Sequence, residues 1–340
     1  MNTKFIVVVI LLVSFLLWMN SYFNGNQENK NEIRTENKQS ATNDIWAEYD
    51  FKNEGLNTNT AKRSVDLGLI LNGWPWKDGI PAINNPQFIK IPEGDSQAGL
   101  NDETLWISVK IWSEAKFYPY SILYWHEIVN DTIWNTKISV TFCPLCGTAI
   151  VYDRVVDGEE LTFWISGKLY QSNLLMYDDL THTLWSQSIW KAVVWDYLDT
   201  KLSVIKSDLI SYKQFKINYP KWLVMSEDTG YNRSYGRSPY SWYETSDELY
   251  FPVEHLDARF AKKELLFVLP YKGESYAFVR SELKEKWVIN YKIWNETIKI
   301  IYKNWEITAM SWDIVIPGYI EMWFSWATQH PGSENIWEGG

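Results

Sequence analysis

Polar and apolar residues alternate with a period of two over most of the chain. The stretches 137–142 and 296–300 show this most clearly, because polar and apolar side chains there take opposite faces of an extended backbone. Helical periodicity is confined to 120–129, 212–217 and 281–286, each shorter than the roughly twelve residues that a helix needs to be stable alone. The pattern predicts a β-rich α+β fold, mostly antiparallel sheet with few short helices.

The chain also repeats part of itself. Shifted by 160 residues without a gap, 105–158 matches 265–318 at 14 of 54 positions, mostly apolar or turn residues. This predicts an internally duplicated module made of a strand, a short helix and a hairpin. The second copy has lysine or glutamate opposite His126, Cys143 and Cys146. We therefore expect any chemistry to reside in the first copy.

Four segments follow from this pattern. Residues 1–19 contain an apolar run, shorter than the roughly 20 residues of a spanning helix, which predicts a secretory signal or a minimal membrane anchor. Residues 20–63 are polar and predict a flexible tether. Residues 64–245 form a β-rich part with the first module copy, and 246–340 carry the second copy, packed with the first. Because no small-residue cleavage site is evident, we expect an uncleaved anchor that holds the protein on the extracytoplasmic side of the membrane; a secreted protein is the alternative.

Charge and motif content narrow the function. The 32 Lys and Arg against 42 Asp and Glu give a net charge of −10, which repels nucleic-acid phosphates, so we expect no nucleic-acid partner. No phosphate loop, dinucleotide fingerprint, zinc-protease motif or hydrolase nucleophile elbow is present. A protein or small-molecule partner stays open.

Tryptophan is unusually common, with 21 Trp against 17 Gly. Trp134-Asn135 and Trp294-Asn295 stand between alternating runs, where a hairpin turn favours the positive φ of glycine. We hypothesise that these codons are UGA, read as tryptophan but encoding glycine in the source organism; a genuinely Trp-rich protein is the alternative. Other tryptophans also interrupt stretches of strand-like sequence: Trp74, Trp76, Trp106, Trp112, Trp164, Trp190, Trp195, Trp242, Trp305 and Trp312.

The two cysteines form one motif, Cys143-Pro144-Leu145-Cys146-Gly147, at a turn between two predicted strands. Two thiolates that converge there can bind half of a soft-metal site for Zn or Cu. They can instead cycle between dithiol and disulfide without a metal. A structural disulfide or a pair of buried thiols is the third interpretation.

A metal needs further ligands. His126 lies 17 residues before Cys143, enough for the chain to return it to the turn, and His330 is a fourth candidate. Four ligands would make a closed structural site, and three would leave an open position for catalysis or metal transfer. Asp131 and Asp153 are candidates to support the ligands or to exchange protons. His182 and His255 lie in polar stretches of the sequence and are expected at the surface.

With the suspect tryptophans read as glycine, the chain resembles the bacterial and archaeal family called domain of unknown function 3179 over about 70–332. The matching strings lie at 77–82, 118–119, 125–132, 143–149, 166–170, 174–178, 184–187, 228–230 and 235–237. The family has tryptophan at positions like 125, 185 and 326 and glycine at positions like 134, 164 and 190, and Tyr120 departs from its usual leucine-like residue.

The resemblance implies that His126, Cys143, Cys146 and His330 are residues of the family pattern, whereas His182 and His255 are not. It implies no settled activity or cofactor. The sequence therefore predicts a membrane-tethered protein that binds Zn or Cu through these four residues. A thiol–disulfide redox protein that uses Cys143 and Cys146 is one alternative, and a non-enzymatic domain that binds envelope components is the other.

Overall fold

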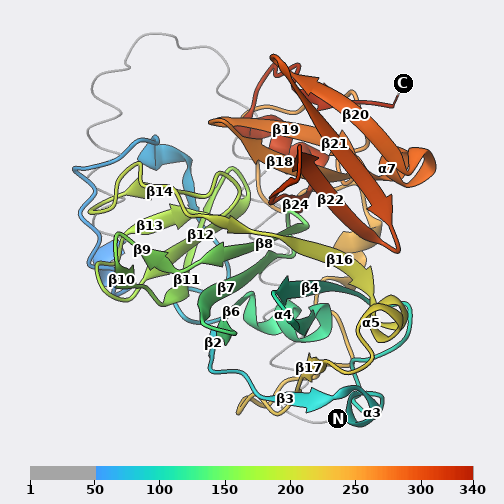
Figure 1. The fold of residues 1–340 in the computed structure, drawn as a ribbon. Helices are drawn as coiled ribbons and strands as arrows, with labels where there is room; N and C mark the ends of the chain where they lie inside the picture. Colours follow the sequence, from blue (N-terminus) through green and yellow to red (C-terminus); the bar gives the residue numbers. More distant parts are fainter. Residues whose placement is uncertain (1–50, 340) are drawn as a thin grey trace. The chain divides into compact units, whose positions relative to one another are not determined.

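The computed structural model describes residues 51–339, which belong to one compact unit, Ala47–Gly340. The fold is β-rich and its sheets are mostly antiparallel, so the predicted fold class is confirmed (Figure 1). The helices are short, and each therefore depends on packing against a sheet for its stability. They are the 3-10 turn η1 (Leu67–Leu69), α3 (Ile91–Gly94), α4 (Tyr120–His126), α5 (Tyr212–Asn218), α6 (Ser241–Thr245), α7 (Arg280–Lys286) and α8 (Trp323–Gln329).

A nine-stranded sheet joins the two module copies. Its order is β2 (Ile83–Asn84), β6 (Ile128–Ile133), β7 (Thr136–Cys143), β8 (Thr148–Asp153), β24 (Tyr319–Met322), β18 (Leu265–Tyr271), β19 (Glu274–Val279) and β25 (Ile336–Trp337), with β15 (Val204–Ile205) also paired to β8. Because β8 pairs with β24, the sheet crosses the predicted boundary near residue 245.

The other strands form four smaller sheets. One has the order β1 (Ile70–Asn72), β11 (Phe163–Tyr170), β12 (Asn173–Asp178), β13 (Leu184–Ser186) and β14 (Lys191–Val194). A second has the order β16 (Ser207–Ser211), β4 (Leu105–Ile111), β5 (Glu114–Pro119), β17 (Leu223–Met225) and β3 (Phe88–Lys90). The third has β20 (Val288–Ile293), β21 (Glu296–Lys303), β22 (Glu306–Ser311) and β23 (Ile314–Ile316), and the fourth pairs β9 (Val155–Val156) with β10 (Glu159–Glu160).

The element bounds repeat along the chain. The series β4, β5, α4, β6 and β7 has the same lengths as β18, β19, α7, β20 and β21, each 160 residues later. The two series diverge after β7, because four residues separate paired Cys143 and Thr148 but only two separate Lys303 and Glu306. The duplication itself stays a prediction, and the divergence falls on the cysteine turn.

The nine-stranded sheet is buried on both faces. In β8, Ala149 and Val151 join one apolar core, whereas Ile150 and Tyr152 join the other. Such alternation sends successive side chains into opposite cores. Strand β7 has an apolar face toward the first core and a polar face, Ser139, Thr141 and Cys143, that is equally buried. Buried polar groups need partners, so this face marks where a site can form.

Many of the positive φ angles belong to tryptophan. Among the residues described, 18 non-glycine residues have positive φ, and eight of them are Trp112, Trp134, Trp190, Trp195, Trp287, Trp294, Trp305 and Trp312. Such angles are disfavoured for residues with a Cβ. The suspected Trp106 behaves differently, because it is fully buried and stacks on Phe117 with ring centroids 4.4 Å apart. The recoding of tryptophan stays a prediction.

The predicted anchor at 1–19 lies outside the described residues. Within 51–339, no helix combines the length and the apolar character needed to cross a membrane. The described end of the predicted tether is packed instead of free: Phe51 and Leu56 are buried, and Glu54 forms an ion pair with Lys168 at 2.7 Å. Phe51 and Leu56 thus bury apolar surface in a segment whose polar composition had predicted too little of it for packing.

Candidate functional site

Cys143 is the last residue of β7, and Cys146 lies on the hairpin loop that connects β7 with β8. The Cys146 N–H donates to the Cys143 carbonyl at 3.1 Å and closes the turn, with Pro144 in the position where its fixed φ fits. Gly147 follows at φ +58, and a Cβ there would lie 2.8 Å from the Met322 side chain. Both cysteines are buried free thiols, 2% and 0% exposed. The turn therefore brings the two sulfurs together without joining them.

Cys143 is surrounded by hydrogen-bond donors. Burial raises the pKa of its thiol, but the Cys146 thiol and the N–H groups of Leu174, Cys146 and Leu145 outweigh burial and leave the pKa below its usual value. Convergent backbone N–H groups stabilise an anion. Cys143 is thus the more acidic thiol of the pair, the one that forms a thiolate more readily.

Cys146 has the opposite environment. Its Sγ donates to the Ser172 carbonyl at 2.9 Å. Burial raises the pKa of the Cys146 thiol well above its usual value; the hydrogen bond to Cys143 and the charges of Cys143 and Glu321 raise it further, and a hydrogen bond from Ser325 opposes them. Cys146 is thus the protonated partner, and the dithiol is asymmetric.

Glu127 is a site residue that the sequence reasoning missed. It follows α4 with φ 54, and its carbonyl accepts from the Phe142 N–H at 2.7 Å, which ties it to the strand that carries Cys143. Burial raises the pKa of its carboxyl well above the usual value and the charge of Cys143 adds to this, whereas the Tyr240 hydroxyl donates to it. A buried carboxylic acid therefore lies beside the thiolate.

Glu321 on β24 is a second site residue that sequence reasoning missed. It is fully buried, and its Oε1 accepts from Ser188 at 2.6 Å, from Ser325 at 2.6 Å and from Thr148 at 3.4 Å. Burial raises the pKa of this carboxyl to about 7, and the hydroxyl hydrogen bonds oppose the rise. The sequence does contain a signal that could have identified it, because Glu321 is the one carboxylate inside the largely apolar stretch 314–324.

His126 lies at the end of α4, beside Glu127, but it faces other partners. Its Nδ1 is 2.7 Å from the Pro81 carbonyl and its Nε2 is 2.7 Å from the Tyr235 hydroxyl. Because a carbonyl can only accept, Nδ1 carries the proton and Nε2 accepts from Tyr235. Burial lowers the pKa of His126 to about 4. Both ring nitrogens are occupied, so the expected approach of this ring to the sulfurs is not what the structure shows.

His330 also differs from the prediction. It follows α8, its ring lies 5.0 Å from that of Trp326, and it borders a pocket with Trp190 and Ser275. Burial lowers its pKa to about 4. Among residues 51–339, no group of three or more His, Cys, Asp or Glu side chains could hold a metal ion. The described residues thus show no such group around Cys143, Cys146, His126 and His330, and the contacts of the two imidazole rings are with Pro81, Tyr235 and Trp326.

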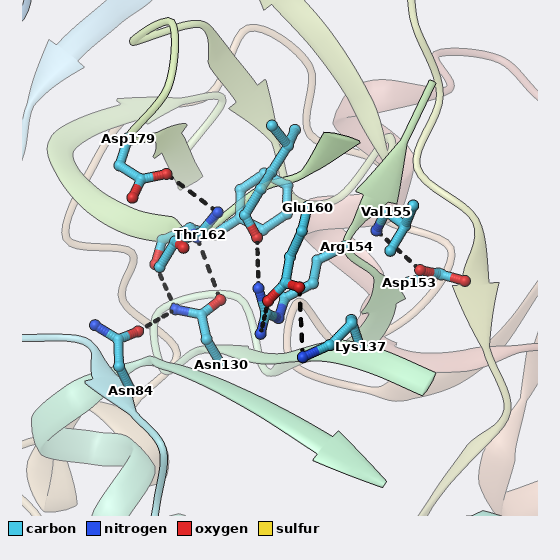
Figure 2. A network of polar contacts seen from close by, with 11 residues as sticks. Asn84, Asn130, Lys137, Asp153, Arg154, Val155, Glu160, Thr162 and Asp179 are labelled. Atoms are coloured by element: carbon cyan, nitrogen blue, oxygen red, sulfur yellow. Dashed lines mark hydrogen bonds and ion pairs between the residues drawn. The ribbon is translucent and has the colours of Figure 1, made fainter. Parts of the chain in front are cut away.

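The two candidate aspartates serve the scaffold. Asp153 accepts from the Val155 N–H at 2.9 Å at the end of β8, beside the Arg154–Glu160 ion pair at 2.8 Å (Figure 2). Asp131 accepts from Lys116 at 2.9 Å and from Tyr118 at 2.7 Å in a buried cluster. Through these hydrogen bonds, both carboxylates stabilise the surrounding scaffold.

The remaining histidines have local partners. His182 Nδ1 accepts from the Asn57 N–H at 3.1 Å, and the His255 N–H donates to Thr328 at 3.4 Å. Neither of these hydrogen bonds connects His182 or His255 to a cysteine.

A cover segment, residues 226–264, spans the site with α6 as its one regular element. Tyr235 bonds to His126, Tyr240 donates to Glu127, and Tyr243 donates to the Leu145 carbonyl at 2.7 Å. Three tyrosines of one segment thus attach to three neighbouring residues of the first module. They explain why both cysteines are buried although they lie at a hairpin turn.

A family model described as "Protein of unknown function (DUF3179)" matches residues 77–317, more than two thirds of the chain. The match includes the cysteine turn, Glu127 and the cover segment, and it ends just before Glu321 and α8. No curated protein and no solved structure matches the chain.

Proposed function

The chain belongs to the DUF3179 family, and on that premise we propose that it carries out thiol–disulfide exchange, with Cys143 as the nucleophile and Cys146 as the resolving thiol. The asymmetry of the pair carries the proposal. Donors stabilise the Cys143 thiolate, whereas Cys146 keeps its proton. A thiolate is the reactive form of cysteine, and a second thiol in reach resolves the mixed disulfide.

The chemistry balances with a small disulfide as the oxidant. The Cys143 thiolate attacks one sulfur, the substrate S–S bond breaks, and one thiolate leaves. Cys146, once deprotonated, attacks the Cys143 sulfur and releases the second substrate thiolate, so the protein is oxidised to a disulfide and the substrate is reduced to two thiols. The reverse sequence uses an external dithiol as the reductant.

Glu127 supplies a proton at the first step. As a buried acid beside Cys143 it can protonate the leaving thiolate and become a carboxylate that Tyr240 stabilises. Its backbone supports this role, because Glu127 has a positive φ at a position after a helix where glycine is favoured. Such strain costs on the order of 1 kcal/mol and persists where function requires the side chain.

The cover segment limits the substrate. With Cys143 2% exposed, a disulfide reaches the sulfur only after the tyrosine contacts of 226–264 open. This favours a small disulfide over a large folded protein. The predicted anchor at 1–19 would place the site on the extracytoplasmic side, where disulfides form and persist.

The test traps the mixed disulfide. The Cys146→Ser variant treated with oxidised glutathione should gain one glutathione at Cys143, detected by intact mass and released by dithiothreitol. Cys143→Ser, the matched control with one thiol left, should gain none, and the wild type should form the internal disulfide. Inert thiols in the folded protein would contradict the proposal, and stoichiometric Zn or Cu lost on either substitution would support the metal prediction instead.

A further inference from the structure

The cover segment is attached to the end of α4 that leads to the cysteine turn. The Tyr231 ring lies 5.2 Å from that of His126, and the Tyr235 hydroxyl is 2.7 Å from His126 Nε2. The residue after His126, Glu127, accepts through its carbonyl from the Phe142 N–H at 2.7 Å, where the cysteine turn begins. Residues 231–235 are therefore fastened to the backbone that holds the reactive sulfur.

Arg233 is the cation on this stretch. Its guanidinium carbon lies 5.9 Å from the centroid of the Trp125 ring, a cation–π contact with α4. The Arg233 side chain is exposed and, among residues 51–339, has no ion pair and no side-chain hydrogen bond. Other arginines of the described chain do bond to oxygen acceptors: Arg63, Arg154, Arg259 and Arg280.

Two carboxylates of the cover segment already have other donors. The Glu227 oxygens accept from the Gly99 N–H at 2.7 Å and the Ala98 N–H at 3.2 Å. Glu244 accepts from the Ser238 hydroxyl at 3.3 Å. Neither carboxylate neutralises Arg233, although the chain has a net charge of −10 and is rich in acidic side chains. The five N–H donors of its guanidinium are therefore available to an external acceptor.

We propose that Arg233 binds a carboxylate of the substrate, so that the substrate class is a small disulfide that carries carboxylates. The inference rests on the proposed thiol–disulfide exchange and adds its specificity-determining residue. A guanidinium binds a carboxylate through two parallel N–H···O hydrogen bonds. One face of the guanidinium lies on Trp125, which reduces the side-chain freedom that is lost when the carboxylate binds.

The required reach is that of a short peptide. Trp125, beneath Arg233, lies two residues before Glu127, whose carbonyl is tied to the strand that ends in Cys143. A substrate that joins Cys143 to Arg233 must therefore cross the end of one helix. A helix with its side chains is about 10 Å across, and three extended residues also span about 10 Å. A tripeptide disulfide such as oxidised glutathione has this length and carries carboxylates at its ends.

The experiment compares two disulfides in the Cys146→Ser background, where exchange stops at the mixed disulfide. The Cys143 thiolate forms an S–S bond to one half of the disulfide, and the other half leaves as a thiolate. Intact mass gives the rate with oxidised glutathione and with the neutral bis(2-hydroxyethyl) disulfide, and the ratio of the two rates measures the preference for carboxylates. In Arg233→Gln we expect this ratio to fall about tenfold, with the rate for the neutral disulfide within about twofold of the parent. Arg233→Lys keeps the charge but loses the planar fork, so it should retain part of the preference.

Arg237→Gln is the matched control, because it removes the same charge from the same segment. Arg237 is also exposed, and within the part of the chain that the structure describes its side chain has no hydrogen bond, ion pair or ring contact that places it on α4. We expect its ratio of rates to stay within about twofold of the parent. An equal loss in Arg233→Gln and Arg237→Gln would show a general attraction by charge and overturn the assignment to Arg233.

Ionic strength supplies a test that needs no variant at Arg233. Exposed charges are screened over about 10 Å at 0.1 M salt. The preference for oxidised glutathione should therefore fall as sodium chloride is added, whereas the rate with the neutral disulfide should not change. A preference that is independent of salt, or unchanged in the folded Arg233→Gln variant, overturns the recognition while the exchange function stands. If neither disulfide reacts with Cys143 in the folded protein, the exchange function is refuted, and the inference with it.

Discussion

Four tryptophans sit at the tips of turns with backbone angles that suit glycine. Trp112, Trp134, Trp294 and Trp312 have φ of 54, 56, 51 and 54°. Their side chains are 80%, 57%, 65% and 88% exposed, so they contribute little packing. Replacing each by glycine removes the steric cost of the positive φ and sacrifices few contacts. We therefore expect each Trp→Gly substitution to stabilise the protein.

The magnitude follows from two opposing terms. Relief of the left-handed backbone is worth about 1–2 kcal/mol per residue. The glycine variant also has more conformational entropy in its unfolded state, which lowers the free energy of unfolding by about 0.4–1 kcal/mol. The net gain is about 1 kcal/mol per site and about 4 kcal/mol for the four together, because they lie in four separate turns and should be nearly additive.

Urea unfolding followed by circular dichroism measures these gains. Alanine at the same positions is the matched control, since Trp→Ala removes the indole but keeps a Cβ at positive φ and should bring little gain. Trp242→Gly, an exposed site in α6 without a positive φ, should be neutral or destabilising. If alanine stabilises as much as glycine, the cost arises from the exposed indole and the backbone argument is wrong.

Three further predictions concern the site. Glu127→Gly should slow formation of the mixed disulfide between Cys143 and oxidised glutathione, whereas Trp287→Gly, at the equivalent position with φ 67 and an exposed side chain, should stabilise the protein in urea unfolding without any effect on that step. Because burial raises the pKa of Glu321 to about 7, the folded protein holds a proton that the unfolded chain releases near pH 4.5, so wild-type stability should fall relative to Glu321→Gln by about 3 kcal/mol between pH 4.5 and 7; parallel pH curves of the two proteins would contradict this. Cys146→Ala removes the thiol that hydrogen-bonds to Cys143, and we expect iodoacetamide to alkylate Cys143 with an apparent pKa closer to that of an ordinary thiol; an unchanged alkylation profile would show that the backbone N–H groups alone lower this pKa.

The alternating pattern predicted the fold class, because the period of two is a local property of each strand. The same is true of the cysteine turn, whose proline and glycine specify its shape within five residues. The expected hairpin turns at Trp134 and Trp294 also lie between paired strands, β6 with β7 and β20 with β21. These features depend on neighbours in the sequence.

The surroundings of the candidate histidine ligands depend instead on distant parts of the chain. His126 is 17 residues from Cys143, near enough to be a ligand, yet its ring direction is set by Pro81 and by Tyr235 from the cover segment. Glu321 could not be placed beside Cys146 either, because it lies 175 positions later in the chain. Only the pairing of β8 with β24 brings the two together.

The sequence alone determined that this chain is a β-rich protein with one dithiol turn and a repeated module pattern, because alternation, turn residues and a pair of nearby cysteines act over a few residues. The tertiary structure decided which groups surround the sulfurs, by pairing β8 with β24 and laying 226–264 over the turn. The physical reason is that the ionisation of a buried thiol or carboxyl depends on the donors and charges within a few ångströms of it, and those come from distant parts of the chain.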